Sequence, residues 1–123
     1  RNPAKLEIIG TGLQSRDFVH VSDVVDAFSL SATKEKAVGQ TFDIGFGKKT
    51  KIIELAKIIL EILNLSGRTV MTTTNVSCKG VIDTIWFDIS KVQSELKWYP
   101  RASLKDNLRE MIIERKMMDE HTR

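Results

Sequence analysis

The stretch Gly10–Val21 constrains the fold more than any other part of the chain, because it places a turn between two β-rich runs. A Gly-x-Gly sequence closes the first run, Leu6–Ile9, and the second run, Asp17–Val21, follows a few residues later. Runs of this composition that flank a short glycine turn predict two strands. One interpretation is therefore a hairpin that carries a solvated ion pair between Arg16 and Asp17.

Arg16 also supports a second interpretation, as an anion-binding residue. Its planar guanidinium is always charged and can bind two oxygens of a phosphate or carboxylate at once. Gln14 and Asp17 lie beside it in the sequence, so a compact polar group stands at one end of the two predicted strands. Asp17 would then hold the guanidinium from the far side. The residues alone leave both interpretations open.

Strand and helix signals alternate along the chain, which predicts an α/β fold with a small mixed sheet and about four helices. Ser, Thr and Asp residues stand at the expected helix starts, where they cap free main-chain N–H groups. The expected strands cover 6–9, 17–21, 41–44, 69–74 and 85–87, and 75–81 is expected to be a loop. The expected helices begin at Ser22, Thr50, Ser90 (a capping box with Gln93) and Ser103 (a capping box with Asp106).

Helical spacing of apolar residues predicts which faces are buried. The first expected helix has its stripe at Val21, Val25, Phe28 and Ala32, the second at Ile52, Leu55, Ala56, Ile59 and Leu63, and the last at Leu104, Leu108, Met111 and Ile112. The aromatic residues Trp86, Phe87 and Trp98 are expected in the core rather than stacked on a ligand, since burial is their usual place.

Composition excludes several classes of protein. The 123 residues suffice for one domain, expected over 1–116 with a frayed tail at 117–123. The single cysteine, Cys78, rules out an internal disulfide, fits a reducing, cytoplasmic location and has no neighbours for a metal site. No apolar run approaches the roughly 20 residues of a membrane helix. The net charge of +3 is spread without a basic stripe, so nucleic acid is not expected as a partner.

Four sequence blocks, in order, resemble one known family. They are Gly-x-Gly-x-Gln-x-Arg-Asp-Phe-Val-His-Val-x-Asp at 10–23, Gly-Gln-Thr-Phe-Asp-Ile-Gly at 39–45, Thr-Lys-Ile-Ile-Glu-Leu-Ala at 50–56, and Asp-Ile-Ser-Lys, Leu-Lys-Trp-Tyr-Pro and Ser-Leu between 88 and 104. Together they are similar to the C-terminal part of extended short-chain dehydrogenase/reductases, the NAD-dependent nucleotide-sugar epimerases and dehydratases. The resemblance implies the substrate-binding part of such an enzyme.

Two motifs of that family do not occur in the chain. The family binds its dinucleotide with an N-terminal Gly-x-x-Gly-x-x-Gly turn and moves protons with a Tyr-x-x-x-Lys pair, whereas the only tyrosine here is Tyr99, followed by Pro100. We therefore expect no catalytic, cofactor-binding or metal-binding residue in this chain. The resemblance implies that NAD(P) belongs to the intact parent enzyme, that the dinucleotide-binding half is missing, and that the chain alone does not turn over substrate.

The resemblance also implies a set of substrate-binding residues. Arg16 takes the place of the arginine that contacts the diphosphate of the nucleotide sugar, and Gln14 is expected to contact the same ligand or to close the turn. Ile9 stands where the family often has an aromatic residue against the nucleotide base. A second phosphate-binding arginine is missing before the Asp-Ile-Ser-Lys block, and Lys79 is expected to substitute for it. Asp43 replaces a family asparagine and adds a negative charge.

Two further points stay open at this stage. The turn Gly45-Phe-Gly47 lies between a predicted strand and helix, as a dinucleotide-binding turn would, but Thr50 replaces the third glycine and a structural turn is the better interpretation. An alternative function is a non-catalytic module that associates, with itself or other proteins, through apolar surface in Val19–Gly45. The nucleotide base, the sugar, and the choice between epimerisation and dehydration are not determined by these residues.

Overall fold

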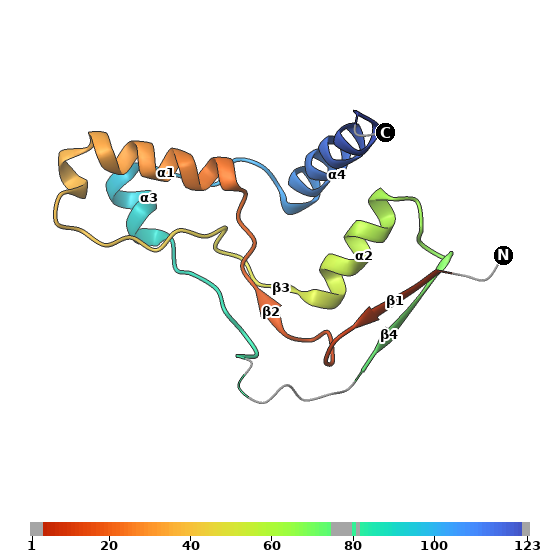
Figure 1. The fold of residues 1–123 in the computed structure, drawn as a ribbon. Helices are drawn as coiled ribbons and strands as arrows, with labels where there is room; N and C mark the ends of the chain where they lie inside the picture. The colour runs from red at the N-terminus through yellow and green to blue at the C-terminus, as the bar shows by residue number, and fades with distance from the viewer. Residues whose placement is uncertain (1–3, 75–79, 81, 122–123) are drawn as a thin grey trace. The chain divides into compact units, whose positions relative to one another are not determined.

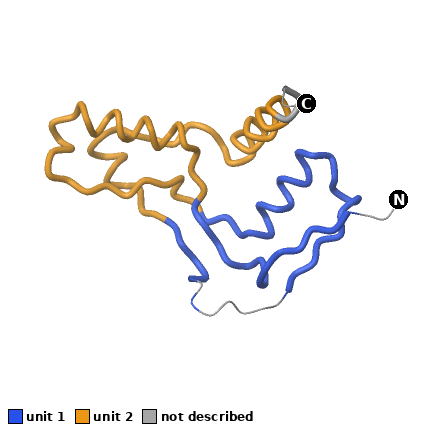
Figure 2. Tube along the Cα trace, in the orientation of Figure 1, with its two compact units in different colours: residues 1–17, 49–86 blue, residues 18–48, 87–123 orange. Residues whose placement is uncertain are grey.

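The computed structural model of the chain describes residues 4–74, 80 and 82–121, with only the backbone at 119–121. The chain forms two compact units, each assembled from separate stretches of sequence (Figure 2). Unit 1 contains residues 1–17 and 49–86, and unit 2 contains residues 18–48 and 87–123. Figure 1 shows the elements in chain order. In the described part of the chain, no helix has the length and apolar character needed to cross a bilayer.

Unit 1 is built on a two-stranded parallel sheet. Strand β1 (Ala4–Ile8) pairs with β4 (Thr69–Thr73) in a register that runs from Ala4 opposite Thr69 to Ile8 opposite Thr73. Parallel strands need a long connection between them, and helix α2 (Ile52–Ile62) lies within that connection. Both strands were predicted, but their pairing with each other was not.

The predicted hairpin is wrong. Strand β2 (Ser15–Arg16) pairs antiparallel with β3 (Thr50–Lys51) and forms a parallel bridge to Thr84, whereas β1 pairs with β4. The reason lies in the turn, where Gly10 and Gly12 have φ values of +86° and +74° and redirect the chain. The expected second strand at 17–21 is therefore displaced to 15–16, and the strand expected at 85–87 is reduced to the single bridge at Thr84.

Helix α2 obtains its N-terminal hydrogen bonds from the glycine turn. The N–H groups of Ile52 and Ile53 donate to the carbonyls of Gln14 and Gly12, each at 3.0 Å. The Glu54 carboxylate accepts from the N–H of Lys51 at 3.1 Å. Free N–H groups at a helix start need such partners. Because the carbonyls of Gln14 and Gly12 and the Glu54 carboxylate are the acceptors here, the cap expected from Thr50 is wrong. The helix ends at Ile62, and its buried face includes Ala56 and Leu60.

Unit 2 is helical and packs around one tryptophan. Its elements are α1 (Val21–Thr33), the short 3-10 helix η1 (Glu35–Ala37), α3 (Ser90–Leu96) and α4 (Leu104–His121). The Trp98 side chain is 2% exposed, and its indole N–H donates to the carbonyl of Asp23 at 2.8 Å. The buried core residues around it are Ala27, Ile89, Val92 and Leu96.

The face of α1 predicted to be buried is exposed. Val21, Val25 and Phe28 are 69%, 55% and 71% exposed, and Ala32 is exposed as well. Asp23 and Ala27 are buried in their place, because the Asp23 carboxylate accepts the N–H of Arg101 at 3.3 Å and its carbonyl accepts the indole N–H of Trp98. A buried carboxylate requires such partners. Because Asp23 faces these donors, the apolar stripe on the other side of α1 is exposed to solvent.

Other parts of unit 2 differ from the prediction in smaller ways. Residues 41–44 form no strand, although Phe42 and Ile44 pack against the core. Helix α3 has no Ser90–Gln93 capping box; instead, Asp88 Oδ1 accepts the Ser90 N–H at 2.9 Å. Hydrogen bonds from the Ser90 side chain and main chain lower the pKa of Asp88.

Helix α4 begins with the predicted Ser103–Asp106 cap, since the two side chains are hydrogen-bonded at 2.6 Å and Ser103 Oγ accepts the Asp106 N–H at 3.2 Å. The helix continues through His121, so residues 117–121 are helical rather than a frayed tail. Asn107 is buried and the predicted core residue Met111 is 54% exposed. The expected core position is also wrong for Trp86 and Phe87, which are 47% and 38% exposed.

Lys97 ends α3 in a left-handed conformation, with φ of 56° and ψ of 36°. This conformation is costly for residues with a Cβ atom and is usual for glycine at helix ends. We predict that Lys97→Gly raises the free energy of unfolding by about 0.5–1 kcal/mol. Urea denaturation measures the change. The control Lys57→Gly, in the interior of α2, should lower stability by about 1 kcal/mol; equal effects of both variants would contradict the prediction.

Gly47 combines a φ of +76° with close packing, since an added Cβ would lie 3.0 Å from Ile89 Cδ1. Gly39 has a similar φ of +69° with no atom within 4 Å of that position. Gly39→Ala should therefore cost only the backbone strain, about 1 kcal/mol. Gly47→Ala should cost roughly 1 kcal/mol more because buried Ile89 must move. Thermal unfolding of both variants checks this order, and the reverse order would show that Ile89 does not determine the choice of glycine.

Candidate functional site

Unit 1 contains an open cleft of about 500 Å³ that holds three of the four predicted binding residues. Ile9, Gln14 and Arg16 all line it, with β1 on one side and α2 on the other. The fourth residue, Lys79, lies outside the described residues, as does Cys78. The glycine turn and β2 thus bring Ile9, Gln14 and Arg16 to one surface.

The Arg16 guanidinium is held by the main chain. Its Nη1 donates to the carbonyl of Ser15 at 2.7 Å, and the side chain is half-buried at the edge of the cleft. Arginine has five N–H donors in a planar group, so this bond uses only one of them. An arginine held in this way can bind an anion without first losing the freedom of a fully mobile side chain.

Gln14 closes the turn and lines the cleft at the same time. Its Nε2 donates to the carbonyl of Ile9 at 3.1 Å, across Gly10 and Gly12. Both alternatives for this residue are therefore compatible with its position, because the side-chain oxygen remains an acceptor. Ile9 itself is 67% exposed and presents an apolar surface next to this polar group.

Helix α2 supplies most of the apolar wall, a contribution that the sequence analysis missed. The helical stripe was predicted only as core, yet it also faces the cleft; the residues concerned are Ile52, Leu55, Ala56 and Ile59, opposite Leu6, Glu7 and Ile8 of β1. Small-molecule sites commonly combine apolar walls with a few polar groups. The arrangement suits a ligand that has an anionic group near Arg16 and a flat, less polar part beside Ile9.

In the turn Gly45-Phe-Gly47, packing and backbone conformation account for Gly47. Its φ is +76°, and an added Cβ would lie 3.0 Å from Ile89 Cδ1. These features are those of a structural turn. In the described part of the chain, no three His, Cys, Asp or Glu side chains come together as a metal site requires.

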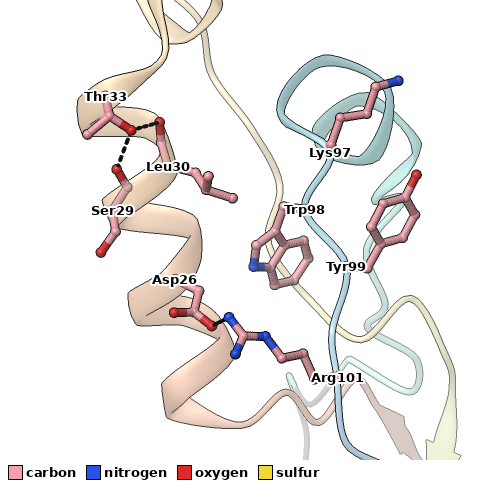
Figure 3. Close-up of a pocket in the computed structure, with 8 residues that line it drawn as sticks. All are labelled: Asp26, Ser29, Leu30, Thr33, Lys97, Trp98, Tyr99 and Arg101. Carbon is pink, nitrogen blue, oxygen red and sulfur yellow. Dashed lines mark hydrogen bonds and ion pairs between the residues drawn. The ribbon is translucent and has the colours of Figure 1, made fainter.

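A second hollow, of about 550 Å³, lies in unit 2 between α1 and the segment after α3 (Figure 3). Four of its polar side chains, those of Asp26, Ser29, Thr33 and Arg101, have partners within unit 2. The Arg101 guanidinium pairs with Asp26, and the Thr33 hydroxyl donates to the carbonyls of Ser29 and Leu30 (Figure 3). The Ser29 hydroxyl donates to the carbonyl of Val25. This pairing indicates a structural seam between two segments rather than a ligand site.

Comparison with known proteins identifies the family. The model of the family described as GDP-mannose 4,6 dehydratase matches residues 2–111. The chain is 34% identical over 103 residues to the uncharacterized UDP-glucose epimerase YtcB of Bacillus subtilis (strain 168), covering 84% of this chain and 32% of that protein.

Solved structures show the same relationship. The UDP-glucose 4-epimerase of Thermotoga maritima with UDP-glucose is 32% identical, with a TM-score of 0.71 over 85% of this chain and 32% of that chain. The UDP-glucuronic acid 4-epimerase of Bacillus cereus in complex with UDP-glucuronic acid and NAD is 28% identical, with the same TM-score and coverage.

The chain thus spans about a third of the length of these relatives. The predicted fold class, a small mixed α/β structure typical of the C-terminal part of these enzymes, is confirmed. The chain belongs to the GDP-mannose 4,6-dehydratase family, within the NAD-dependent nucleotide-sugar epimerases and dehydratases of the extended short-chain dehydrogenase/reductase group.

Proposed function

We propose that this chain is the part of an NAD(P)-dependent epimerase or dehydratase that binds the nucleotide-diphosphate sugar. The observation that carries the proposal is the single cleft lined by Ile9, Gln14 and Arg16. Arg16 binds the diphosphate, Ile9 contacts the base and Gln14 holds the turn between them. Lys79 supplies a second positive charge near the diphosphate.

The chemistry of the cleft supports this assignment. A guanidinium binds phosphate oxygens in a bidentate manner, and the α2 wall offers apolar surface for the uncharged part of the ligand. Two relatives of known structure were solved with UDP-glucose and with UDP-glucuronic acid. We infer the same class of ligand for this chain, without a choice of base or sugar.

The intact enzyme would bind NAD(P) and carry out proton transfer with residues outside this chain. NAD(P) supplies hydride acceptance and return at the sugar, and no residue described here is proposed to hold it. The contribution of this chain is to bind a remote part of the substrate, since such binding energy orients the reacting carbon. We propose a reducing, cytoplasmic setting on the basis of the single cysteine.

The proposal predicts the effect of removing Arg16. Arg16→Ala should weaken binding of the matching nucleotide sugar by about 10- to 100-fold, because a charge-assisted contact contributes ~1.5–3 kcal/mol. Arg16→Lys should recover only part of the affinity, since lysine lacks the bidentate geometry. Calorimetry with UDP, dTDP, GDP and CDP sugars, on this chain and on the longer protein, measures these constants.

The matched control is Arg68→Ala, which removes an exposed arginine that does not line the cleft. It should leave the affinity unchanged. If Arg16→Ala and Arg68→Ala have the same dissociation constant as the wild type in the longer protein, Arg16 does not bind the ligand and the proposed function loses its main support.

A second candidate function is a non-catalytic interaction module, and the exposed face of α1 favours it. Val21, Val25 and Phe28 form an apolar stripe on the surface. Beside Phe28, a groove of about 320 Å³ runs to residues 40–44, which have no strand partner among the described residues. Exposed apolar surface of this kind promotes association. This candidate assigns the surface to a second copy of the chain.

The module hypothesis predicts that the wild-type chain self-associates and that Phe28→Glu makes it monomeric, because a charge on the stripe cannot be buried without a partner. Ile113→Glu, at a residue of α4 that is 56% exposed and lies outside Val19–Gly45, is the control and should not change the oligomeric state. Light scattering distinguishes the two functions. A monodisperse wild-type monomer that binds nucleotide sugars would exclude self-association as the role of this surface.

A further inference from the structure

Strand β4 has an open edge that carries no charge. It pairs with β1 on one side, and no other strand pairs with it among the described residues. Strand β1 contains Lys5 and Glu7, whereas 69–74 contains no charged residue and no proline. Natural sheets commonly protect their open edges with charged residues or proline. Strand β4 therefore lacks the residues that usually prevent an edge from pairing with another chain.

The main-chain groups of Met71 point toward this open edge. The N–H of Thr74, the residue after β4, donates to the carbonyl of Ile8 at 3.1 Å and so faces β1. In a strand, the N–H and C=O groups of successive residues point to alternate sides. Thr72 and Val70 therefore also face β1, and Met71 faces away from it. The N–H and C=O of Met71 have no partner among the described residues, and such groups need one if they leave water.

The side chains beside this edge suit a second strand. Val70 is 46% exposed and Thr72 is exposed as well. Because the two residues are separated by one, their side chains lie on the same face of the sheet. Valine and threonine are β-branched, and such side chains pack well across strands. The exposed face next to the open edge is thus uncharged and has the residue types of a paired strand.

We propose that two copies of this chain pair through their β4 strands, antiparallel and about a two-fold axis at Met71. In this register, Met71 of each copy exchanges two main-chain hydrogen bonds with Met71 of the other, as directly opposite residues do in an antiparallel pair. Val70 of each copy lies opposite Thr72 of the other. The pairing uses both open edges at once, so the assembly closes as a dimer.

The charge pattern favours a second copy as the partner. Arg68 is the charged residue next to the start of β4. In the proposed register it lies opposite Thr74 of the other copy, so the two arginines do not meet. Like charges directly opposite each other would destabilise such a pair, and this register has none between 68 and 74. The inference does not depend on the proposed function, since it concerns β4 and not the binding of a nucleotide sugar.

A pair of double variants that differ at one residue tests the register. Val70→Glu/Thr72→Lys places opposite charges across the interface and should still form the dimer. Val70→Lys/Thr72→Lys places like charges there, so its dimer dissociation constant should be roughly tenfold higher or more. Analytical ultracentrifugation over a concentration series measures both constants, and urea denaturation checks that both variants are folded. Equal dissociation constants for the two folded variants would overturn the proposal.

Phe28→Glu is the matched control for the other exposed surface. It changes the apolar stripe of α1 and leaves β4 unaltered. The dimer should therefore survive in Phe28→Glu and be lost in Val70→Lys/Thr72→Lys. The reverse result would assign association to α1 and overturn the proposal, as would a wild-type chain that stays monomeric throughout the concentration series.

Amide hydrogen exchange provides a local measurement of the proposed pairing. The Met71 N–H should exchange faster at low protein concentration and slower at high concentration, because it becomes hydrogen-bonded only in the dimer. The Thr74 N–H, which donates to Ile8 within one copy, should show much less dependence on concentration. A dimer in which exchange at Met71 does not respond to concentration would show that β4 is not the interface.

Discussion

The main chain of Ser15 is the point on which the candidate site depends. Its N–H donates to the carbonyl of Asp83 at 2.8 Å, and its carbonyl accepts the N–H of Ile85 at 3.1 Å. Ser15 also lies opposite Lys51 in the β2–β3 pair. Three distant stretches of unit 1 therefore meet at one buried residue. Ser15 also accepts the hydrogen bond of the Arg16 guanidinium. Main-chain pairing thus contributes to the position of the proposed diphosphate-binding residue.

Unit 2 depends on a comparable contact, in which the segment after α3 binds the first turns of α1. The Trp98 indole N–H donates to the Asp23 carbonyl, and the Arg101 main-chain N–H donates to the Asp23 carboxylate. These bonds determine which side of α1 is buried. The apolar stripe on the other side is exposed. The same first turn begins at the N-cap residue His20, whose side chain accepts the N–H of Ser22.

Local signals gave mixed results. The Ser103–Asp106 cap is correct because both partners are close in sequence, whereas the caps expected from Thr50 and from Ser90 with Gln93 do not form. The hairpin and the buried face of α1 are wrong because partners distant in sequence determine them. A stripe of apolar residues indicates that a face can be buried, but an aspartate with two suitable donors can override it.

The sequence by itself determined the family, the order of most elements and the residue most suited to a phosphate, because short motifs carry that information. It did not determine that β1 pairs with β4, that α2 walls the cleft, or that Val21 and Phe28 remain exposed. Those features were decided by the tertiary structure. Hydrogen-bonding groups that leave water must find partners, and which partners are in reach depends on how the whole chain is folded.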